Sequence, residues 1–253
     1  MDLPRGYISY SQINTYQNCP QKYYFSYIEE ISPPVNEKIF LGVVFHATLE
    51  HYFNQKISGN EIKKQELVTL FCEKFRTLRE EREIFWDSSQ AEIEDRGISF
   101  IKYFENNLAP GITPLMVEKE LEVELAEVGV RLKGILDLVE QDFSITDFKT
   151  TNAKWSGSRM KRSFLQMVIY KYLFEQSFGL INPKLKLKIL YANPSKNVKY
   201  QEVFLNPDDI DLKQMFKIIH YVVENISKGV FYKNESYICG FCEFNDICHQ
   251  LKK

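Results

Sequence analysis

The sequence lacks several features that would assign it to familiar classes. Its 253 residues contain no apolar run close to the roughly 20 residues that cross a bilayer, no internal repeat and no low-complexity stretch. The motif GxxxxGK[ST] is absent, so nothing indicates a motor driven by a phosphate-binding loop. A net charge of −2 argues against indiscriminate binding to nucleic acid. Nothing like a secretory leader precedes Ile8, so we expect a cytoplasmic protein (nuclear or organellar in a eukaryote) without a membrane partner.

An ordinary apolar share of 44% can supply one sizeable core, and residues 1–253 are expected to form a single domain. Apolar patterning predicts helices near residues 9–18, 20–30, 42–53, 61–83, 90–107, 159–178 and 207–228. It predicts strands over residues 117–125, 130–140, 185–192 and 199–205, and a short one over 143–148. Strands bracketed by helices indicate an α/β or mixed α+β sheet.

Two carboxylates and a lysine lie in two short apolar runs, residues 135–139 and 143–148 with the lysine just after. Strands of that length joined by a tight turn would bring Asp137 and Asp147 side by side at a sheet end. Convergent carboxylates repel each other and are stable mainly around a divalent cation. Lys149 would point to the same strand face as Asp147, so metal, water and cation would converge as phosphodiester hydrolysis requires. The same triplet also fits a solvated strand end.

The cysteines have the spacing of a metal–thiolate site. Cys239 and Cys242 form a CxxC pair, Cys248 follows six residues later, and Cys19 is the natural fourth ligand. Cys72 lies in a charge-rich helical stretch and is expected to be a small apolar helix residue. Disulfides are the alternative, and zinc would fit the same four thiolates. Ligation would join both ends of the chain and remove much entropy from its unfolded state.

Charge is unevenly spread along the chain. Residues 149–199 contain eleven Lys or Arg and one acid, a net charge of +10, whereas residues 61–146 have a net charge of −8. Phosphate neutralisation needs such a local cluster. Lys184, Lys186 and Lys188 alternate with leucines and fit a solvated strand face equally well. The better candidates for DNA contact are the basic residues directly after the acid–lysine strand: Lys154, Arg159, Lys161 and Arg162.

Short motifs in a fixed order carry a family resemblance. They are Ile8–Ile13 with Tyr16–Pro20, Gly42–His46, Val117–Glu118, Gly134–Asp137, Asp147–Thr150, Gln166 with Tyr170, and the closing CxxC-x5-C. Together they resemble the RecB-like branch of the PD-(D/E)XK nucleases, in its iron–sulfur subgroup. That subgroup includes the AddB nuclease domain, CRISPR-associated RecB-like exonucleases and stand-alone exonucleases of phages and eukaryotes. The resemblance runs nearly end to end, interrupted mainly over about residues 52–112, where a helical insertion is expected.

The resemblance implies a restriction-endonuclease-like core and roles for particular residues. The implied ligands of Mg²⁺ or Mn²⁺ are His46, Asp137, Asp147 and the carbonyl of Phe148, with Glu118 a weaker candidate. The implied catalytic residues are Asp137, Asp147, Lys149, Gln166 and Tyr170. Cys19, Cys239, Cys242 and Cys248 would bind a [4Fe–4S] cluster that joins the two termini through a cysteine loop at residues 237–250. Spacing alone makes His46 an ordinary helix residue; neutral imidazole as a ligand would favour Mn²⁺ over Mg²⁺.

These features together predict a metal-dependent DNA nuclease, with exonuclease action on single-stranded ends as the activity that the resemblance implies. The alternative is a DNA-end-binding subunit of a repair, recombination or CRISPR-adaptation complex. A helicase or a CRISPR-adaptation protein is an expected partner, because the chain has no motor motif of its own. A zinc-stapled RNA-binding module is disfavoured, since no aromatic RNA-recognition motif is present.

Overall fold

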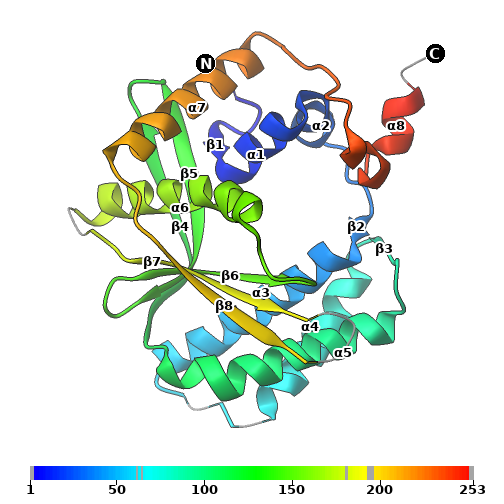
Figure 1. Ribbon diagram of the computed structural model, residues 1–253, viewed down its shortest axis with the longest axis vertical. Helices are drawn as coiled ribbons and strands as arrows, with labels where there is room; N and C mark the ends of the chain where they lie inside the picture. The colour runs from blue at the N-terminus through cyan, green and yellow to red at the C-terminus, as the bar shows by residue number, and fades with distance from the viewer. Residues whose placement is uncertain (1–2, 61, 64, 180–181, 193–196, 251–253) are drawn as a thin grey trace.

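The computed structural model describes residues 3–60, 62–63, 65–179, 182–192 and 197–250. A twisted mixed sheet divides the molecule into two helical layers (Figure 1). Its strands are β1 (Tyr7–Ser9), β4 (Pro114–Leu125), β5 (Val130–Glu140), β6 (Ile145–Thr151), β7 (Leu185–Tyr191) and β8 (Lys199–Leu205). Their order is β1-β5-β6-β7-β8, and β4 pairs with β5. The predicted α/β class, with a mixed parallel and antiparallel sheet, is confirmed.

Strand β5 organises the sheet because it has different partners along its two edges. Antiparallel β4 pairs with it over its whole length, from Val130 to Glu140. On the other edge, β1 pairs in parallel with residues 131–133, and β6 pairs with Leu138 and Val139. Residues 134–137 therefore lie at a gap between β1 and β6 on that edge. The gap exposes the part of β5 that carries Asp137.

Helices cover both faces of the sheet and enclose two apolar cores (Figure 1). The first layer contains α1 (Tyr10–Asn18), α6 (Gly157–Phe178) and α7 (Asp209–Ser227). The second contains α3 (Glu37–Ile57), α4 (Glu66–Glu80) and α5 (Gln90–Tyr103). Alternate residues of one strand serve the two cores, as Ile145 and Phe148 of β6 do. None of the described helices is both long and apolar enough to cross a membrane.

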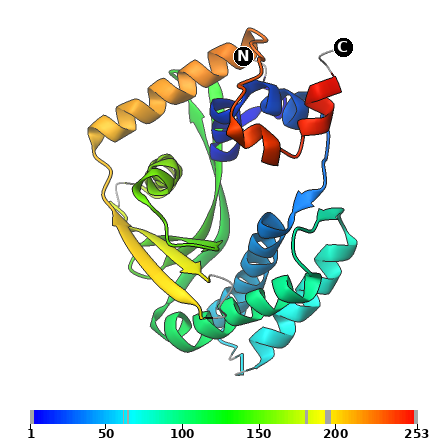
Figure 2. The same ribbon diagram turned by 45° about the vertical axis from the view of Figure 1, so that its right-hand side comes forward.

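Short elements complete the fold. They are α2 (Pro20–Tyr23), π-helical turns at Tyr24–Ile28 and Phe104–Leu108, 3-10 turns at Ala109–Gly111 and Tyr237–Phe241, α8 (Asn245–Gln250), and the paired strands β2 (Val35–Asn36) and β3 (Ile84–Phe85). The amino-terminal α1 and α2 lie beside the carboxy-terminal 3-10 turn and α8 (Figure 2). The two ends of the chain therefore meet, although they are far apart in sequence.

The strand and helix predictions hold with informative differences. Helix α3 begins at Glu37 rather than at Gly42, because Asn36 caps it by accepting a hydrogen bond from the Lys38 backbone. Strand β6 begins at Ile145, since Phe143 belongs to the turn and has a φ of 61°. The predicted helix over 61–83 is α4, which starts at Glu66; residues 61 and 64 lie outside the described part. Strands β1, β2 and β3 were missed because two or three residues show no period.

The lysines of β7 do not form a solvated face. Glu140 is 5% exposed, and its carboxylate lies 3.0 Å from the Nζ atom of Lys186 and 4.0 Å from that of Lys188. Thr146 donates to the same carboxylate at 3.0 Å. Lys188 is itself buried, and burial lowers its pKa. The strand pairing of β5, β6 and β7 brings these groups together, which the alternation of lysine and leucine could not reveal.

Candidate metal centre and cysteine pocket

Asp137 and Asp147 lie on neighbouring strands at the point where β5 and β6 separate. The last paired residues are Leu138 with Thr146, so the next step of the ladder would pair the two aspartates. Instead, the Asp137 carboxylate accepts a hydrogen bond from the Phe148 backbone nitrogen at 2.9 Å. The carboxylates are neighbours as predicted, but they lie within the sheet rather than at its end. The reason is that β5 continues along β4 beyond the gap.

His46 reaches this point from α3. Its Nε2 atom lies 3.0 Å from the carbonyl oxygen of Phe148, and its Nδ1 atom lies 3.5 Å from Asp137 Oδ2. The carbonyl can only accept, so Nε2 donates to it, and Nδ1 faces the carboxylates, where it would supply its lone pair once a metal displaced its proton. The Phe148 carbonyl thus orients His46 in this structure. A carbonyl oxygen has a second lone pair, so the predicted contact with a metal stays a prediction.

Glu118 joins the group through an unusual backbone conformation. Its φ is +42° within β4, a left-handed conformation that side chains other than glycine rarely adopt. Its Oε1 atom lies 3.6 Å from His46 Nδ1. The ligand atoms of His46, Glu118 and Asp137 lie within 4.8 Å of one another, and no other such group of three occurs among the described residues. Glu118 therefore belongs to the site, while its neighbour Glu120 pairs with Lys133 on the surface.

Asp147 is paired with Lys149 beside this group. Both residues point to the same face of β6, as the period of two predicted, and Lys149 Nζ lies 2.9 Å from each Asp147 oxygen. Only the contact with Oδ1 has hydrogen-bond geometry. The Oδ2 atom is fully buried and has no hydrogen-bond partner among the described residues. The Lys149 ammonium balances the charge of Oδ2, but a buried carboxylate oxygen with no well-aligned donor leaves room for a second cation as its partner.

Helix α6 closes the site from the other side. Gln166 donates to the Tyr170 hydroxyl at 2.8 Å, so these two predicted residues form one unit on the helix face. Gly134 lets the helix approach β5, because a Cβ there would lie 2.6 Å from Leu173 Cδ1. Tyr10, which the sequence motifs do not mark as a site residue, donates to the Arg162 carbonyl at 2.9 Å, and burial raises its pKa against the opposing charge of Lys149.

The site carries concentrated negative charge. Burial lowers the pKa of His46, but Asp137 and Glu118 outweigh burial and raise that pKa to about 9. Burial raises the pKa of Asp147, and Asp137 adds to the rise against the opposing Lys149. Burial raises the pKa of Tyr170 well above its usual value, and both aspartates contribute. The nitrogen and carboxylate oxygens of His46, Glu118 and Asp137 are close enough to share one ion, so this donor set fits a divalent cation, which would balance the negative charge.

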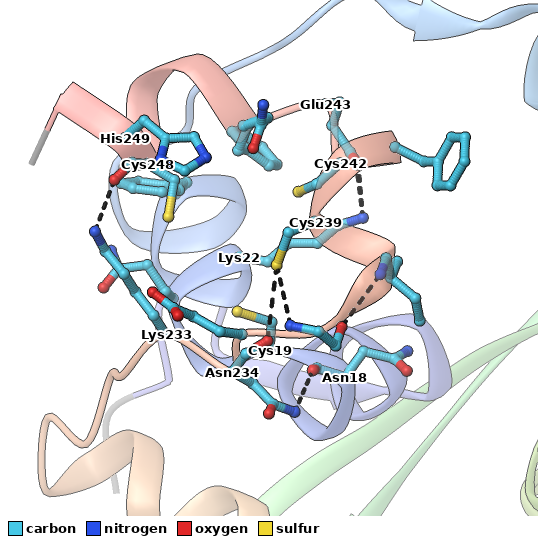
Figure 3. A pocket seen from close by; sticks show the side chains of 18 of the residues that line it. Asn18, Cys19, Lys22, Lys233, Asn234, Cys239, Cys242, Glu243, Cys248 and His249 are labelled. Carbon is cyan, nitrogen blue, oxygen red and sulfur yellow. Dashed lines mark hydrogen bonds and ion pairs between the residues drawn. The ribbon is translucent and has the colours of Figure 1, made fainter.

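The four predicted cysteine ligands surround a separate cavity of about 370 Å³ between the two ends of the chain (Figure 3). Cys19 comes from the junction of α1 and α2, and Cys239, Cys242 and Cys248 come from the carboxy-terminal segment. All four are free thiols. Cys72 lies in α4 against the second core, away from this cavity. The two sides are tied by Lys22 with Glu243 at 2.8 Å, and by Asn234 donating to the Asn18 carbonyl at 2.9 Å.

The basic residues after β6 separate onto different surfaces. Lys154, Arg159, Lys161 and Arg162 are all exposed. Arg162 lines the cysteine cavity, whereas Arg159 donates to the Thr151 hydroxyl at 3.2 Å and lines a second hollow at the end of β6. The contiguous sequence cluster is therefore divided by the first turns of α6. A helix turns its residues through all directions, so sequence neighbours face different surfaces.

The mixed sheet, the acid pair, the lysine and the histidine define a metal-dependent phosphodiester hydrolase. The chain belongs to the PD-(D/E)XK nuclease superfamily, whose sequence model matches residues 7–249. None of the proteins with curated functions matches it.

A solved structure shares the fold. A Eubacterium rectale protein described as a presumed exonuclease is similar over 95% of this chain and 88% of its own, with a TM-score of 0.63 and 13% identity. At that identity the likeness shows the fold alone. The protein SSO0001 has a TM-score of 0.39 and 13% identity over 86% of each chain, too low a similarity to inform the site.

Proposed function

We propose that this protein is a divalent-metal-dependent deoxyribonuclease that degrades single-stranded DNA from its ends. The supporting observation is the His46, Glu118 and Asp137 group beside the buried pair of Asp147 and Lys149. These are the parts that hydrolysis of a phosphodiester needs: a metal site, a place for water, and a cation near the developing charge. The superfamily supplies the phosphodiester chemistry; the preference for DNA ends is the proposal.

His46, Glu118 and Asp137 would hold the cation, with Asp147 completing the set through its unsatisfied Oδ2 atom. The bound metal supplies an activated water and neutralises charge on the phosphate. Lys149 is positioned by Asp147 to donate to that water or to a phosphate oxygen. Tyr170, held by Gln166, would contact the scissile strand or the lysine. Both Mg²⁺ and Mn²⁺ are candidates, and the imidazole favours Mn²⁺.

We propose in addition that the four cysteines hold a [4Fe–4S] cluster. Zinc with Zn–S bonds of about 2.3 Å in a tetrahedron needs sulfurs about 3.8 Å apart. Among the described residues no three cysteine sulfurs lie within 4.8 Å of one another, although all four line the same cavity. That wider spacing favours a larger group. Anaerobic purification followed by iron, sulfide and zinc analysis tests this, and one equivalent of zinc without iron would refute the cluster.

The test of activity is cleavage of end-labelled DNA with Mg²⁺ or Mn²⁺. Linear single strands should be shortened from an end, while circular single strands should stay intact because they have no end. Duplex DNA, blunt and with overhangs, measures the strand preference. Undiminished cleavage by a contaminant-free Asp147→Ala protein would overturn the assignment.

The second candidate is a DNA-end-binding subunit of a repair, recombination or CRISPR-adaptation complex. Tight binding to DNA ends without cleavage under any metal condition would favour it. The presence of Asp137, Asp147 and Lys149 together argues for catalysis, because a protein that no longer catalysed hydrolysis would not need to keep them. A helicase partner and a cytoplasmic location stay predictions.

A further inference from the structure

Gly42 is a glycine that packing inside the protein does not explain. It lies in the interior of α3, where glycine weakens a helix relative to alanine. A Cβ at this position would meet only the Thr150 hydroxyl at 3.8 Å, an ordinary contact. In contrast, a Cβ at Gly97 would lie 2.0 Å from the ring of Phe71, and that glycine is needed for packing. A group from outside the chain is therefore the simplest reason for the missing side chain at Gly42.

The position of Gly42 indicates what that group is. Lys38, Gly42 and His46 are spaced four residues apart and share one face of α3. Gly42 thus lies midway between the metal ligand His46 and the lysine, which is two turns or about 12 Å earlier along the helix. A chain molecule crossing this face would pass closest to the backbone at Gly42.

At the Lys38 end, this face opens into a hollow of about 200 Å³. Its polar lining comes from Lys38, from Thr150, Thr151 and Asn152 at the end of the catalytic strand, and from Arg159 of α6. Arg96 donates to the Asn152 Oδ1 atom at 3.0 Å, which orients the amide. Lys38 has one acid nearby, Asp87, at a long 4.0 Å on the exposed surface. Cationic, hydroxyl and amide groups converge here, the donor set that binds a phosphate.

We propose that this hollow is a phosphate subsite for the substrate strand, binding a phosphate next to the one that is cleaved, and that Gly42 is the floor over which the strand runs. The proposal rests on the proposed nuclease function and adds a binding site to it. Lys38 and Arg159 neutralise the phosphate charge, and the threonine hydroxyls and the Asn152 amide donate to its oxygens. Such contacts position the strand without reading its sequence.

Binding without turnover tests the subsite separately from catalysis. Fluorescence anisotropy in EDTA, with a labelled single-stranded oligonucleotide, should show about tenfold weaker binding for Lys38→Gln and for Arg159→Gln. The slope of log affinity against log salt should fall by about one for each variant, because each removes one phosphate contact. Lys217→Gln, an exposed lysine on α7 outside the hollow, is the matched control and should bind like the wild type. Wild-type affinity and salt slope in both variants would overturn the subsite.

Substituted oligonucleotides identify which phosphate is bound. One methylphosphonate linkage next to the cleaved bond should weaken the wild type and have little further effect on Lys38→Gln. If only a terminal phosphate matters, 5′-phosphorylated, 3′-phosphorylated and unphosphorylated strands will differ for the wild type and not for the variant. Equal losses in wild type and variant for every substituted strand would place the contact elsewhere and overturn the proposal.

Gly42→Ala tests whether the substrate strand passes over the backbone at Gly42. The variant should keep or raise the melting temperature, because alanine is the better helix former and has room, while its affinity for single strands falls severalfold. Unchanged affinity would remove Gly42 from the path of the strand. A wild-type protein that binds DNA yet never cleaves it with Mn²⁺ or Mg²⁺ would refute the nuclease function instead, and the anisotropy results would still decide the subsite.

Discussion

Two side chains of the metal centre are held in arrangements that an unconstrained chain would avoid. Glu118 has a left-handed backbone in a strand, a conformation that costs on the order of 1–3 kcal/mol. Asp147 is buried with one oxygen lacking a hydrogen-bond partner among the described residues. Strain of this kind persists where the surrounding structure enforces it, and it concentrates at functional sites. Both features point at the same place, where a cation would make them favourable.

Glu118→Gln should weaken Mn²⁺ binding at least tenfold, because a neutral amide replaces a charged ligand while the side-chain shape is kept. Isothermal titration calorimetry of the purified protein measures this. Glu120→Gln is the matched control: it lies two residues along the same strand, is exposed, and pairs with Lys133. Equal Mn²⁺ affinity for both variants would exclude Glu118 from the ligand set, and its left-handed backbone conformation would then have no explanation in metal binding.

Lys149→Gln should lower the rate of DNA cleavage by about 10² to 10³-fold, the usual effect of removing one donor from the developing charge. Mn²⁺ binding should survive, since the lysine supplies no ligand atom and the His46, Glu118 and Asp137 group stays intact. Single-turnover cleavage at saturating protein separates this loss from weaker DNA binding. Lys133→Gln, on the sheet surface, is the control. A Lys149 variant that cleaves at the wild-type rate would exclude the lysine from the chemistry.

The site depends on strand β5, because the two edges of this strand are paired differently. One edge is paired along its whole length with β4, while the other is shared by β1 and β6 with a gap at residues 134–137. The gap frees Asp137 to accept a hydrogen bond from Phe148 and to face His46. Beyond the gap, Glu140 at the end of β5 binds Lys186 of β7 and Thr146 of β6. This buried network joins three strands beside the candidate metal centre.

Glu140→Gln should destabilise the protein by roughly 3 kcal/mol, because half-buried Lys186 loses the carboxylate 3.0 Å away and buried Lys188 keeps only Glu202, at 3.9 Å. Urea unfolding followed by circular dichroism measures the change. Glu124→Gln on the exposed side of β4 should change stability by less than about 0.5 kcal/mol. If both variants unfold alike, the network contributes nothing to the stability of the sheet.

The cysteine pocket acts on the molecule as a whole. It joins α1 and α2 to the last segment of the chain, so a bound cluster would close nearly the entire polypeptide into one loop. Closing a long loop removes entropy from the unfolded state, and a metal that binds only the folded chain adds its binding energy to folding. The ends are also held by direct contacts: Lys22 pairs with Glu243, the Tyr16 hydroxyl donates to the Val230 carbonyl, and Phe25 packs against Phe244.

Cys19→Ser should abolish the brown colour of anaerobically purified protein and lower its melting temperature, because the cage loses one thiolate and the ends separate. Cys72→Ser, in α4 and away from the pocket, should keep both the colour and the stability. Absorbance near 400 nm and thermal unfolding provide the two readouts. Equal melting temperatures for Cys19→Ser and the wild type would remove Cys19 from the cage.

The sequence alone was sufficient to predict the fold class and most of the long strands and helices. Periods of two and 3.6 located the long strands and helices, since each follows from which side chains meet the core. It did not predict β1, whose three residues show no period, or the true start of α3, which a single cap at Asn36 determines. The gap in the sheet depends on β1 and so was also invisible.

Some features of the candidate site were predictable from the sequence, and others were visible only in the structure. Spacing along the chain selected Asp137, Asp147, Lys149 and the four cysteines as candidates, and the family resemblance added His46. The family resemblance made Glu118 a weak candidate, and the tertiary structure places it against the histidine. Tertiary structure alone decided that Lys186 and Lys188 pair with Glu140 and that Arg159 and Arg162 face different hollows. Each of these depends on a backbone angle, a strand register or a helix rotation. Those quantities are set by packing between distant segments, which no local pattern encodes.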